Sequence, residues 1–297
     1  MLDLVVTYVN PKEEGWLNEY KIFHPSYSQA ESSRFRDWGF LKYWFRGVAQ
    51  NMPFINNLFF VVSNKKQVPS WVNEKYLKII EHKDIIPPEI LPTFNSVTIE
   101  MHLDKIKDLS EKFIYSNDDF FAIGPMSEED FFDGERPLIV FNSLNLLDKP
   151  SVWQEAMLRN CKELAKFYGK KIDATNFPMP AHFMMPLKKE TMKEVNSLMK
   201  DSLYSSFSHK DRHSVTDVTP YLYLWNEMFQ GGIHANSLRC KYFSGRKEND
   251  FLVEDFSNLQ QICINDTDWD HLEYLKAKQD LIVRFEHMFP GKCKYEK

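Results

Sequence analysis

Hydrophobic and polar positions along this chain follow two patterns, short apolar runs and apolar residues at helical spacing. The apolar runs are typical of buried strands and cover residues 2–9, 57–62, 76–80, 112–116, 137–141 and 261–264. Helical spacing predicts helices over 34–48, 95–103, 152–168, 187–199, 219–229 and 272–289. Strands that alternate with helices indicate an α/β fold, with a mixed, partly parallel sheet flanked by helices and a more helical second half.

No internal repeat or low-complexity linker divides the chain. Its 297 residues are enough for two domains at a typical ~150 residues each. We place the boundary within 142–180, which separates an α/β half, 1–141, from a helix-rich half, 142–297. We expect the two halves to act as one integrated domain, because nothing in the composition marks a linker between them.

Composition excludes several classes of protein. Apolar residues make up 43% and charged residues 27%, as in an ordinary globular protein. The 37 Lys and Arg against 42 Asp and Glu give a net charge of −5, which argues against a nucleic-acid-binding surface. No stretch approaches the about 18 apolar residues of a membrane span, and residues 2–9 are typical of a strand rather than a signal peptide. We therefore expect a cytoplasmic protein with no transmembrane segment.

Cysteine and glycine usage narrows the chemistry further. The four cysteines are scattered and lack CxxC spacing, so we expect reduced thiols with neither a zinc site nor a disulfide framework. Only 10 residues are glycine, and no P-loop, GxGxxG, GxSxG or HExxH pattern occurs. Phosphate binding would therefore rest on metal, arginine, lysine and histidine rather than on a glycine-rich loop.

Acidic and amide residues directly follow two of the predicted strands. They are Asn117, Asp118 and Asp119 after 112–116, and Asn265 and Asp266 after 261–264. Open α/β sheets bind ligands at the carboxyl ends of their strands, and Mg²⁺ takes one or two carboxylates together with phosphate oxygens. Each group alone is more often an Asx-turn than a site, and this holds most clearly for Asn265 and Asp266. Two such strand ends in one chain favour a common crevice with a divalent metal, held mainly by Asp119 and Asp266.

Other polar residues each allow a structural and a chemical interpretation. Arg36 and Asp37 open a predicted helix, where they form either a surface salt bridge or a phosphate clamp. His182 lies in a proline-flanked loop, where it is either solvated or an acid–base group at neutral pH. Arg212 lies in a polar stretch that is typical of a solvated loop. Asn95 is a good N-cap for the helix that follows it.

Four groups of motifs extend over nearly the whole chain. They are LVVTYVN at 4–10; RFRD at 34–37 with VPSW at 68–71, LPTFNS at 91–96, Glu100, His102 and FIYSNDDFF at 113–121; HFMMP at 182–186 with Arg212; and CIND at 263–266. In this order they resemble the four conserved blocks of the Stealth family of sugar-phosphate transferases, which includes bacterial capsular-polysaccharide phosphotransferases. The second block of the family usually continues Arg-Asp-Asn, whereas Trp38 follows Asp37 here.

The resemblance implies a GT-A-like, Rossmann-like fold and a divalent metal, Mg²⁺ or Mn²⁺. It implies transfer of a sugar-1-phosphate from a nucleotide diphosphate sugar, with a UDP-sugar as the expected donor. The acceptor would be a hydroxyl of a growing capsular or other cell-surface polysaccharide, or of a lipid-linked oligosaccharide, and a nucleoside monophosphate would be released. Residues 1–141 would bind the nucleotide sugar and 142–297 would complete the active site, in the cytoplasm or at the inner face of the cell membrane.

The resemblance also assigns roles to single residues. The catalytic residues would be His182, Asp119, Arg212, Asp37 and Glu100. The nucleotide sugar would be bound by Asn10, Arg36, Asn95 and Asn117. The metal would be held by Asp118, Asp119, Asn265 and Asp266. Either His182 or Asp119 would accept the proton of the acceptor hydroxyl, and the residue types fit both. To act on one diphosphate, the strand ends near 10, 119 and 266 would have to meet His182 in one crevice.

Two other functions fit parts of the pattern. A metal-dependent GT-A glycosyltransferase would attack the anomeric carbon and release a nucleoside diphosphate. The histidine of the third block and the second acidic strand end favour phosphotransfer over that reaction. A sugar-binding module without activity would bind the nucleotide sugar without turnover, and the intact acidic, histidine and arginine positions argue against it.

Overall fold

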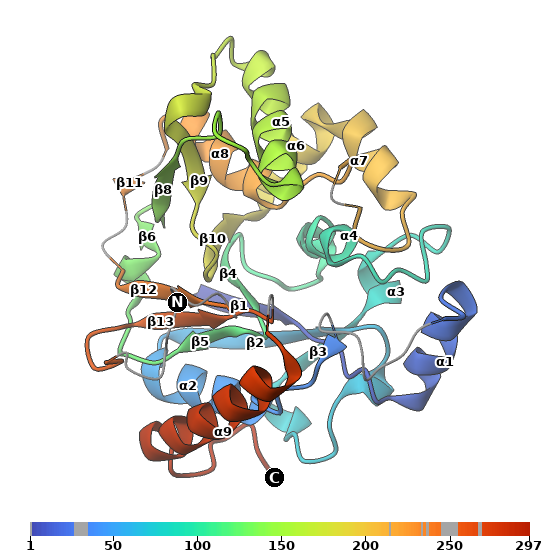
Figure 1. The fold of residues 1–297 in the computed structure, drawn as a ribbon, viewed down its shortest axis with the longest axis vertical. Helices are drawn as coiled ribbons and strands as arrows, with labels where there is room; N and C mark the ends of the chain where they lie inside the picture. The colour runs from blue at the N-terminus through green and yellow to red at the C-terminus, as the bar shows by residue number, and fades with distance from the viewer. Residues whose placement is uncertain are drawn as a thin grey trace.

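A mixed five-stranded sheet forms the centre of the molecule (Figure 1). The computed structural model describes residues 2–26, 35–213, 215–232, 234–235, 238–244, 255–266 and 269–297. The sheet has the order β10-β4-β1-β2-β3, formed by β1 (Leu2–Thr7), β2 (Ile55–Val62), β3 (Lys78–Glu81), β4 (Lys112–Asn117) and β10 (Met185–Lys188). Strands β1 to β4 pair in parallel and β10 runs antiparallel to β4, which confirms the predicted mixed sheet.

Helices cover both faces of this sheet (Figure 1). Successive side chains of β1 point to opposite faces, so Leu4 packs on one side and Val5 on the other. The Leu4 face lies against α2 (Leu41–Asn51) and α9 (His271–Met288). The Val5 face lies against α5 (Val152–Phe167), α6 (Lys189–Leu198) and α8 (Tyr221–Phe229). Because both faces are buried, the strands are continuous apolar runs rather than alternating ones.

A smaller sheet brings the second acidic strand end beside the first. Asp118 and Asp119 form the turn between β4 and β5 (Phe120–Ala122), and β5 pairs antiparallel with β13 (Gln261–Ile264). Strand β13 also pairs in parallel with β12 (Cys240–Phe243). The register sets Cys263 opposite Phe120, and the Ile264 amide donates to the Asp119 carbonyl at 3.0 Å. Residues 117–119 and 263–266 are therefore neighbours.

The remaining elements surround these sheets. They are α1 (Glu14–Phe23), α3 (His82–Ile85), α4 (Ser96–Glu100), α7 (Lys200–Phe207), β6 (Phe132–Asp133), β7 (Arg136–Ile139), β8 (Phe141–Leu144), β9 (Phe177–Pro180) and β11 (His234–Ala235). Side-chain caps fix several helix starts, including Ser151 before α5 and Asp270 before α9. Within the described residues, no helix has the length and apolar character needed to cross a membrane.

Three predicted helices begin later than their apolar spacing indicates, among them the one expected from 219, which begins at Tyr221. The helix expected from Arg34 begins at Leu41. Gly39 has a left-handed φ of +71°, which interrupts a helix before that point. Arg34 itself lies outside the described residues. The helix expected from Leu187 begins at Lys189. Leu187 instead pairs with β4, because the sheet edge offers its backbone hydrogen-bond partners.

Candidate active site

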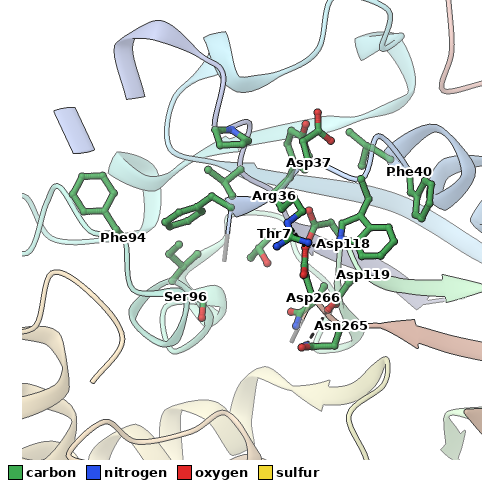
Figure 2. A pocket seen from close by; sticks show the side chains of 18 of the residues that line it. Thr7, Arg36, Asp37, Phe40, Phe94, Ser96, Asp118, Asp119, Asn265 and Asp266 are labelled. Carbon is green, nitrogen blue, oxygen red and sulfur yellow. Dashed lines mark hydrogen bonds and ion pairs between the residues drawn. The ribbon is translucent and has the colours of Figure 1, made fainter. Parts of the chain in front are cut away.

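A cavity of about 580 Å³ opens at the carboxyl ends of β1 and β4. This edge of the sheet is where α/β proteins bind ligands. The segment before α2, the start of α4, the β4–β5 turn and residues 264–266 supply most of its walls. Figure 2 shows Phe94 and Ser96 on one side of the cavity, and Asp118, Asp119 and Asp266 on the other. The cavity thus has an aromatic end and an acidic end.

The acidic end holds the carboxyl groups of Asp118, Asp119 and Asp266, and nearby cations balance their charge only in part. Removal from water raises the pKa of Asp118 to about 7 and that of Asp119 to about 8, and the Asp118 charge adds to the second shift. Within the described residues, Asp119 Oδ1 and Asp266 Oδ1 are buried and have no hydrogen-bond partner. Buried carboxylate oxygens without partners fit a divalent cation, which would supply the missing positive charge.

Arg36 and Trp38 hold Asp266 from the opposite side. Trp38 Nε1 donates to Asp266 Oδ2 at 2.9 Å, and Arg36 Nε lies 3.4 Å from the same oxygen. The Arg36 guanidinium also stacks 4.5 Å above the Tyr274 ring, and Figure 2 shows it beside the acidic group. Among the residues that the structure describes, its buried Nη1 atom has no hydrogen-bond partner, so this guanidinium still has a donor for a phosphate oxygen. Trp38, where the chain departs from the family pattern, therefore orients an acidic residue.

Cys263 is a site residue that the cysteine spacing does not reveal. Ligand atoms of Asp119, His182 and Cys263 all lie within 4.8 Å of one another, and Cys263 Sγ is 3.8 Å from Asp119 Oδ2. Asn265 Nδ2 donates to the same oxygen at 3.5 Å. Residues two apart in extended backbone share a face, so alternation continued one residue past β13 would group Cys263 with Asn265. The donor set is therefore mixed, with oxygen, nitrogen and sulfur atoms around one point.

His182 lies in the segment between β9 and β10, and its side chain lines the cavity. Its Nδ1 atom is 2.8 Å from the Tyr221 hydroxyl, and its ring meets the Phe120 ring edge-on at 4.8 Å. Burial, with a smaller effect of the Arg212 charge, lowers the pKa of His182 to about 4. The imidazole is therefore neutral near pH 7 and can accept a proton. Asp119, Asp266 and His182 line one crevice, as expected, but the strand end near 10 contributes Val9 and Pro11 rather than Asn10.

Glu100, the last residue of α4, also lines the cavity. Its Oε1 atom accepts from the Tyr115 hydroxyl at 3.1 Å, and that hydroxyl is also 2.6 Å from Asn117 Oδ1. Burial raises the pKa of Glu100 to about 7, against the opposing effects of Arg212 and Tyr115. Arg212 donates to the Ser96 hydroxyl, which anchors this cationic side chain at the cavity. The carboxyl is thus poised to change charge near neutral pH.

Of three other predicted residues, only Asp37 lines the cavity, whereas Asn95 and Asn10 lie outside it. Asp37 lines the cavity, and its carboxylate pairs with Lys12 Nζ at 3.0 Å. Asn95 is fully buried and outside the lining, where it caps α4 and donates to Asp217 at 2.8 Å. Asn10 is also outside the lining, and its side chain accepts from the Lys12 amide. The other predicted residues line the cavity: Arg36, Glu100, Asn117, Asp118, Asp119, His182, Arg212, Asn265 and Asp266.

The aromatic end comes from three segments that the sequence pattern does not connect. Trp16 on α1 meets Phe35 at 5.1 Å and Phe94 at 5.8 Å between ring centroids, both edge-on. All three rings line the cavity. Aromatic rings offer a planar heterocycle a stacking surface, so this end suits a nucleobase. No local motif marks it, because the rings come together only in the folded chain.

The acidic end is expected to make the metal-free protein less stable as pH rises. Below the ordinary Asp pKa of 3.8, folded and unfolded states are both protonated. From there to about 8, the unfolded chain loses protons that folded Asp118 and Asp119 retain, so the free energy of unfolding decreases. Calorimetry in EDTA should show the Tm of the wild type falling between about pH 5 and 8. The Tm of the double variant Asp118→Asn, Asp119→Asn should fall less over the same pH range. Equal falls of Tm in both proteins would contradict the raised pKa of these two carboxyls.

Known proteins resemble this chain over most of its length. The family model for Stealth protein CR2, conserved region 2, matches residues 34–138. The capsular polysaccharide phosphotransferase WcwK of Streptococcus pneumoniae is 29% identical over all of this chain and 98% of its own length. The exopolysaccharide phosphotransferase cps2G of Lactiplantibacillus plantarum is 27% identical over all of this chain and 96% of its own. The capsular polysaccharide phosphotransferase fcs1 of Haemophilus influenzae is 30% identical over 90% of this chain and 78% of its own.

A solved structure shares the fold. The crystal structure of the galactosyltransferase LgtC, in complex with donor and acceptor sugar analogues, matches with a TM-score of 0.51. The match covers 99% of this chain and 97% of LgtC, at 10% sequence identity. At that identity the likeness concerns the fold alone, and it confirms the predicted GT-A-like architecture.

Proposed function

Since this chain belongs to the Stealth family of phosphotransferases, we propose that it moves a sugar-1-phosphate from a nucleotide diphosphate sugar to a hydroxyl of a growing cell-surface polysaccharide. One observation carries the proposal beyond the family. A neutral histidine, two arginines and buried carboxylates without partners line one cavity that also has an aromatic end. Phosphoryl transfer depends mainly on positioning and on charge neutralisation, which this set of groups can provide.

The donor would lie along the length of the cavity. Its nucleobase would stack at the aromatic end of Trp16, Phe35 and Phe94, and its diphosphate would reach the acidic end. Arg36 and Arg212 would bind phosphate oxygens, because a guanidinium matches their geometry with two donors. A UDP-sugar is the expected donor. Its base and its diphosphate match a cavity with a stacking surface at one end, and arginines beside buried carboxylates at the other.

A divalent metal would be held by Asp119 and Asp266, whose buried oxygens lack partners. Asp118 and Asn265 would support it from the same strand ends. When bound, the metal would neutralise the charge of the diphosphate. Carboxylate and amide oxygens suit both Mg²⁺ and Mn²⁺, so we propose either ion for this site.

His182 is the proposed proton acceptor. The acceptor oxygen would attack the sugar-bearing phosphorus and form one P–O bond, while the bond from that phosphorus to the bridging oxygen breaks and nucleoside monophosphate leaves. The hydroxyl proton would pass to His182 Nε2. For that, Nδ1–H must donate to the Tyr221 oxygen, a contact of 2.8 Å. Asp119 is the less suitable base, because a carboxylate that holds a cation has less affinity for a proton.

Both halves of the chain contribute to this site, and we propose that 1–141 and 142–297 form one catalytic unit. Strand β10 of the second half extends the central sheet beside β4, and β13 positions Asp266. The acceptor would be a polysaccharide or lipid-linked oligosaccharide. The chain would meet it in the cytoplasm or at the inner membrane face.

The released nucleotide distinguishes this function from its main alternative. The fold shared with a galactosyltransferase keeps sugar transfer as the second candidate, and that reaction releases a nucleoside diphosphate. We expect incubation with a panel of UDP-sugars and Mn²⁺ or Mg²⁺ to release UMP, identified by ion-exchange chromatography. Release of UDP in its place would reject the phosphotransferase assignment.

A further inference from the structure

A second pocket of about 80 Å³ adjoins the main cavity. The residues that line both spaces are Glu100, Asn117, His182 and Arg212. Beyond them, the small pocket continues to the first turns of α5, with Trp153 and Met157, and to residues 217–221 before and at the start of α8. Because His182 belongs to both walls, a group bound in the small pocket lies beside the proposed proton acceptor.

The wall of this pocket joins an exposed aromatic ring to His182. Trp153 lies in the first turn of α5 and 41% of its surface is exposed, so its ring is accessible to a ligand. Its ring meets the Tyr221 ring edge-on, with 6.5 Å between centroids. The Tyr221 hydroxyl in turn contacts His182 Nδ1 at 2.8 Å. A ligand packed on Trp153 is thereby directed along Tyr221 toward the imidazole.

The charges of the pocket favour a neutral, polar occupant. Its charged lining residues are Glu100, Asp217 and Arg212. The Asp217 carboxylate is already engaged, because Oδ1 contacts His209 Nδ1 at 2.8 Å and Oδ2 accepts from Asn95 Nδ2 at 2.8 Å. The lining therefore combines acidic groups with the Arg212 cation, so neither a free anion nor a free cation is favoured. Hydroxyl groups can donate to Glu100 and accept from Arg212 at the same time.

The size of the pocket limits what enters it. A water molecule needs about 10–15 Å³ of such space, so 80 Å³ admits a few hydroxyl-sized groups rather than a whole glycan. One edge of a pyranose ring has that size, with polar hydroxyls at its rim and an apolar C–H face. Aromatic rings pack well against apolar faces of this kind, and pockets that bind small molecules combine such rings with a few polar groups.

We propose that this pocket is the acceptor subsite. One edge of a neutral pyranose enters it, packs its C–H face on Trp153 and presents a hydroxyl to His182. This inference rests on the proposed function and deepens it, since it separates the route of the acceptor from that of the donor. The donor occupies the main cavity, between the aromatic end of Trp16, Phe35 and Phe94 and the acidic strand ends. The two substrates then meet at His182, Arg212 and Glu100.

Binding of simple glycosides to tryptophan variants tests this subsite. Saturation-transfer NMR uses the full-length protein and three probes, the methyl β-glycosides of galactose, glucose and N-acetylglucosamine at millimolar concentration. We expect saturation transfer from wild-type protein to the C–H protons of at least one probe, loss of that signal in Trp153→Ala, and recovery in Trp153→Phe. Trp71→Ala is the matched control, because Trp71 is 37% exposed and lines neither pocket.

Kinetics provide a second measurement. With the glycoside that binds, we expect Trp153→Ala to raise its KM about tenfold, the upper range for one aromatic contact. Trp71→Ala should leave this KM unchanged, because Trp71 lines neither pocket. Equal saturation transfer in wild type and Trp153→Ala, or none from the wild type to any probe, would overturn the proposal. Release of UDP by the wild type would instead reject the proposed function. The NMR experiment would still show whether a glycoside contacts Trp153.

Discussion

Replacement of Asp119 by asparagine is expected to lower turnover about 10³-fold, because metal-ion stabilisation of a phosphoryl transition state is worth several kcal/mol and ~1.4 kcal/mol is tenfold in rate. Within the described part of the chain, one buried oxygen of Asp119 has no hydrogen-bond partner, and Asp119 lies next to Cys263 and His182. Asparagine keeps the shape and removes the charge. Turnover with saturating UDP-sugar and Mn²⁺ is the measurement.

Two controls accompany this variant. Asp133→Asn changes an exposed carboxylate that pairs with Arg136 on the surface, and it should leave turnover unchanged. Excess EDTA should reduce wild-type turnover to the level of Asp119→Asn. Added Mn²⁺ should restore the turnover of the wild type but not that of the variant. Full wild-type activity in EDTA would show that the buried carboxylates do not act through a metal.

Replacement of His182 by glutamine should lower turnover by about 10²–10⁴-fold, the usual range for loss of a general acid–base group. The side chain of glutamine retains a polar contact to Tyr221 but accepts no proton near neutral pH. Donor KM should change little, because Arg36 and the acidic strand ends provide the contacts proposed for the nucleotide sugar. Steady-state kinetics and the Tm of the same preparation are measured together.

The Tm separates a catalytic from a structural effect. His182 is only partly buried and its ring packs edge-on against Phe120, so a small loss of Tm is expected alongside a large loss of turnover. His287→Gln is the matched control, since His287 lies exposed in the last turn of α9, outside the cavity. Near-normal turnover of His182→Gln would remove His182 from the reaction and leave Asp119 as the candidate base.

The sequence pattern predicted the parts of the site that depend on strand ends. Buried strands need continuous apolar runs, and polar residues just after such runs lie at one edge of a parallel sheet. That reasoning placed Asp119 and Asp266 in one crevice, as the structure confirms. It also identified His182, through the proline-flanked loop and the family motif.

Other parts of the site depend on long-range pairing that no local pattern contains. Cys263 reaches Asp119 only because β13 pairs antiparallel with β5, and the register of that pair is set by the folded sheet. The aromatic end of Trp16, Phe35 and Phe94 likewise combines three separate segments. Asn95 shows what a local pattern can and cannot predict. It caps α4, as its sequence position indicates, but it does not line the cavity where the nucleotide sugar would bind.

The fate of the phosphorus atom next to the sugar tests the central claim most directly. A UDP-sugar labelled with ³²P at the β-phosphate is incubated with the protein, Mn²⁺ and a glycoside or polysaccharide acceptor, and the products are separated by chromatography. Transfer of sugar-1-phosphate predicts that the label appears in the glycan product, as a phosphodiester, while unlabelled UMP is released. Label that remains in released UDP, with an unlabelled glycan product, would contradict the account.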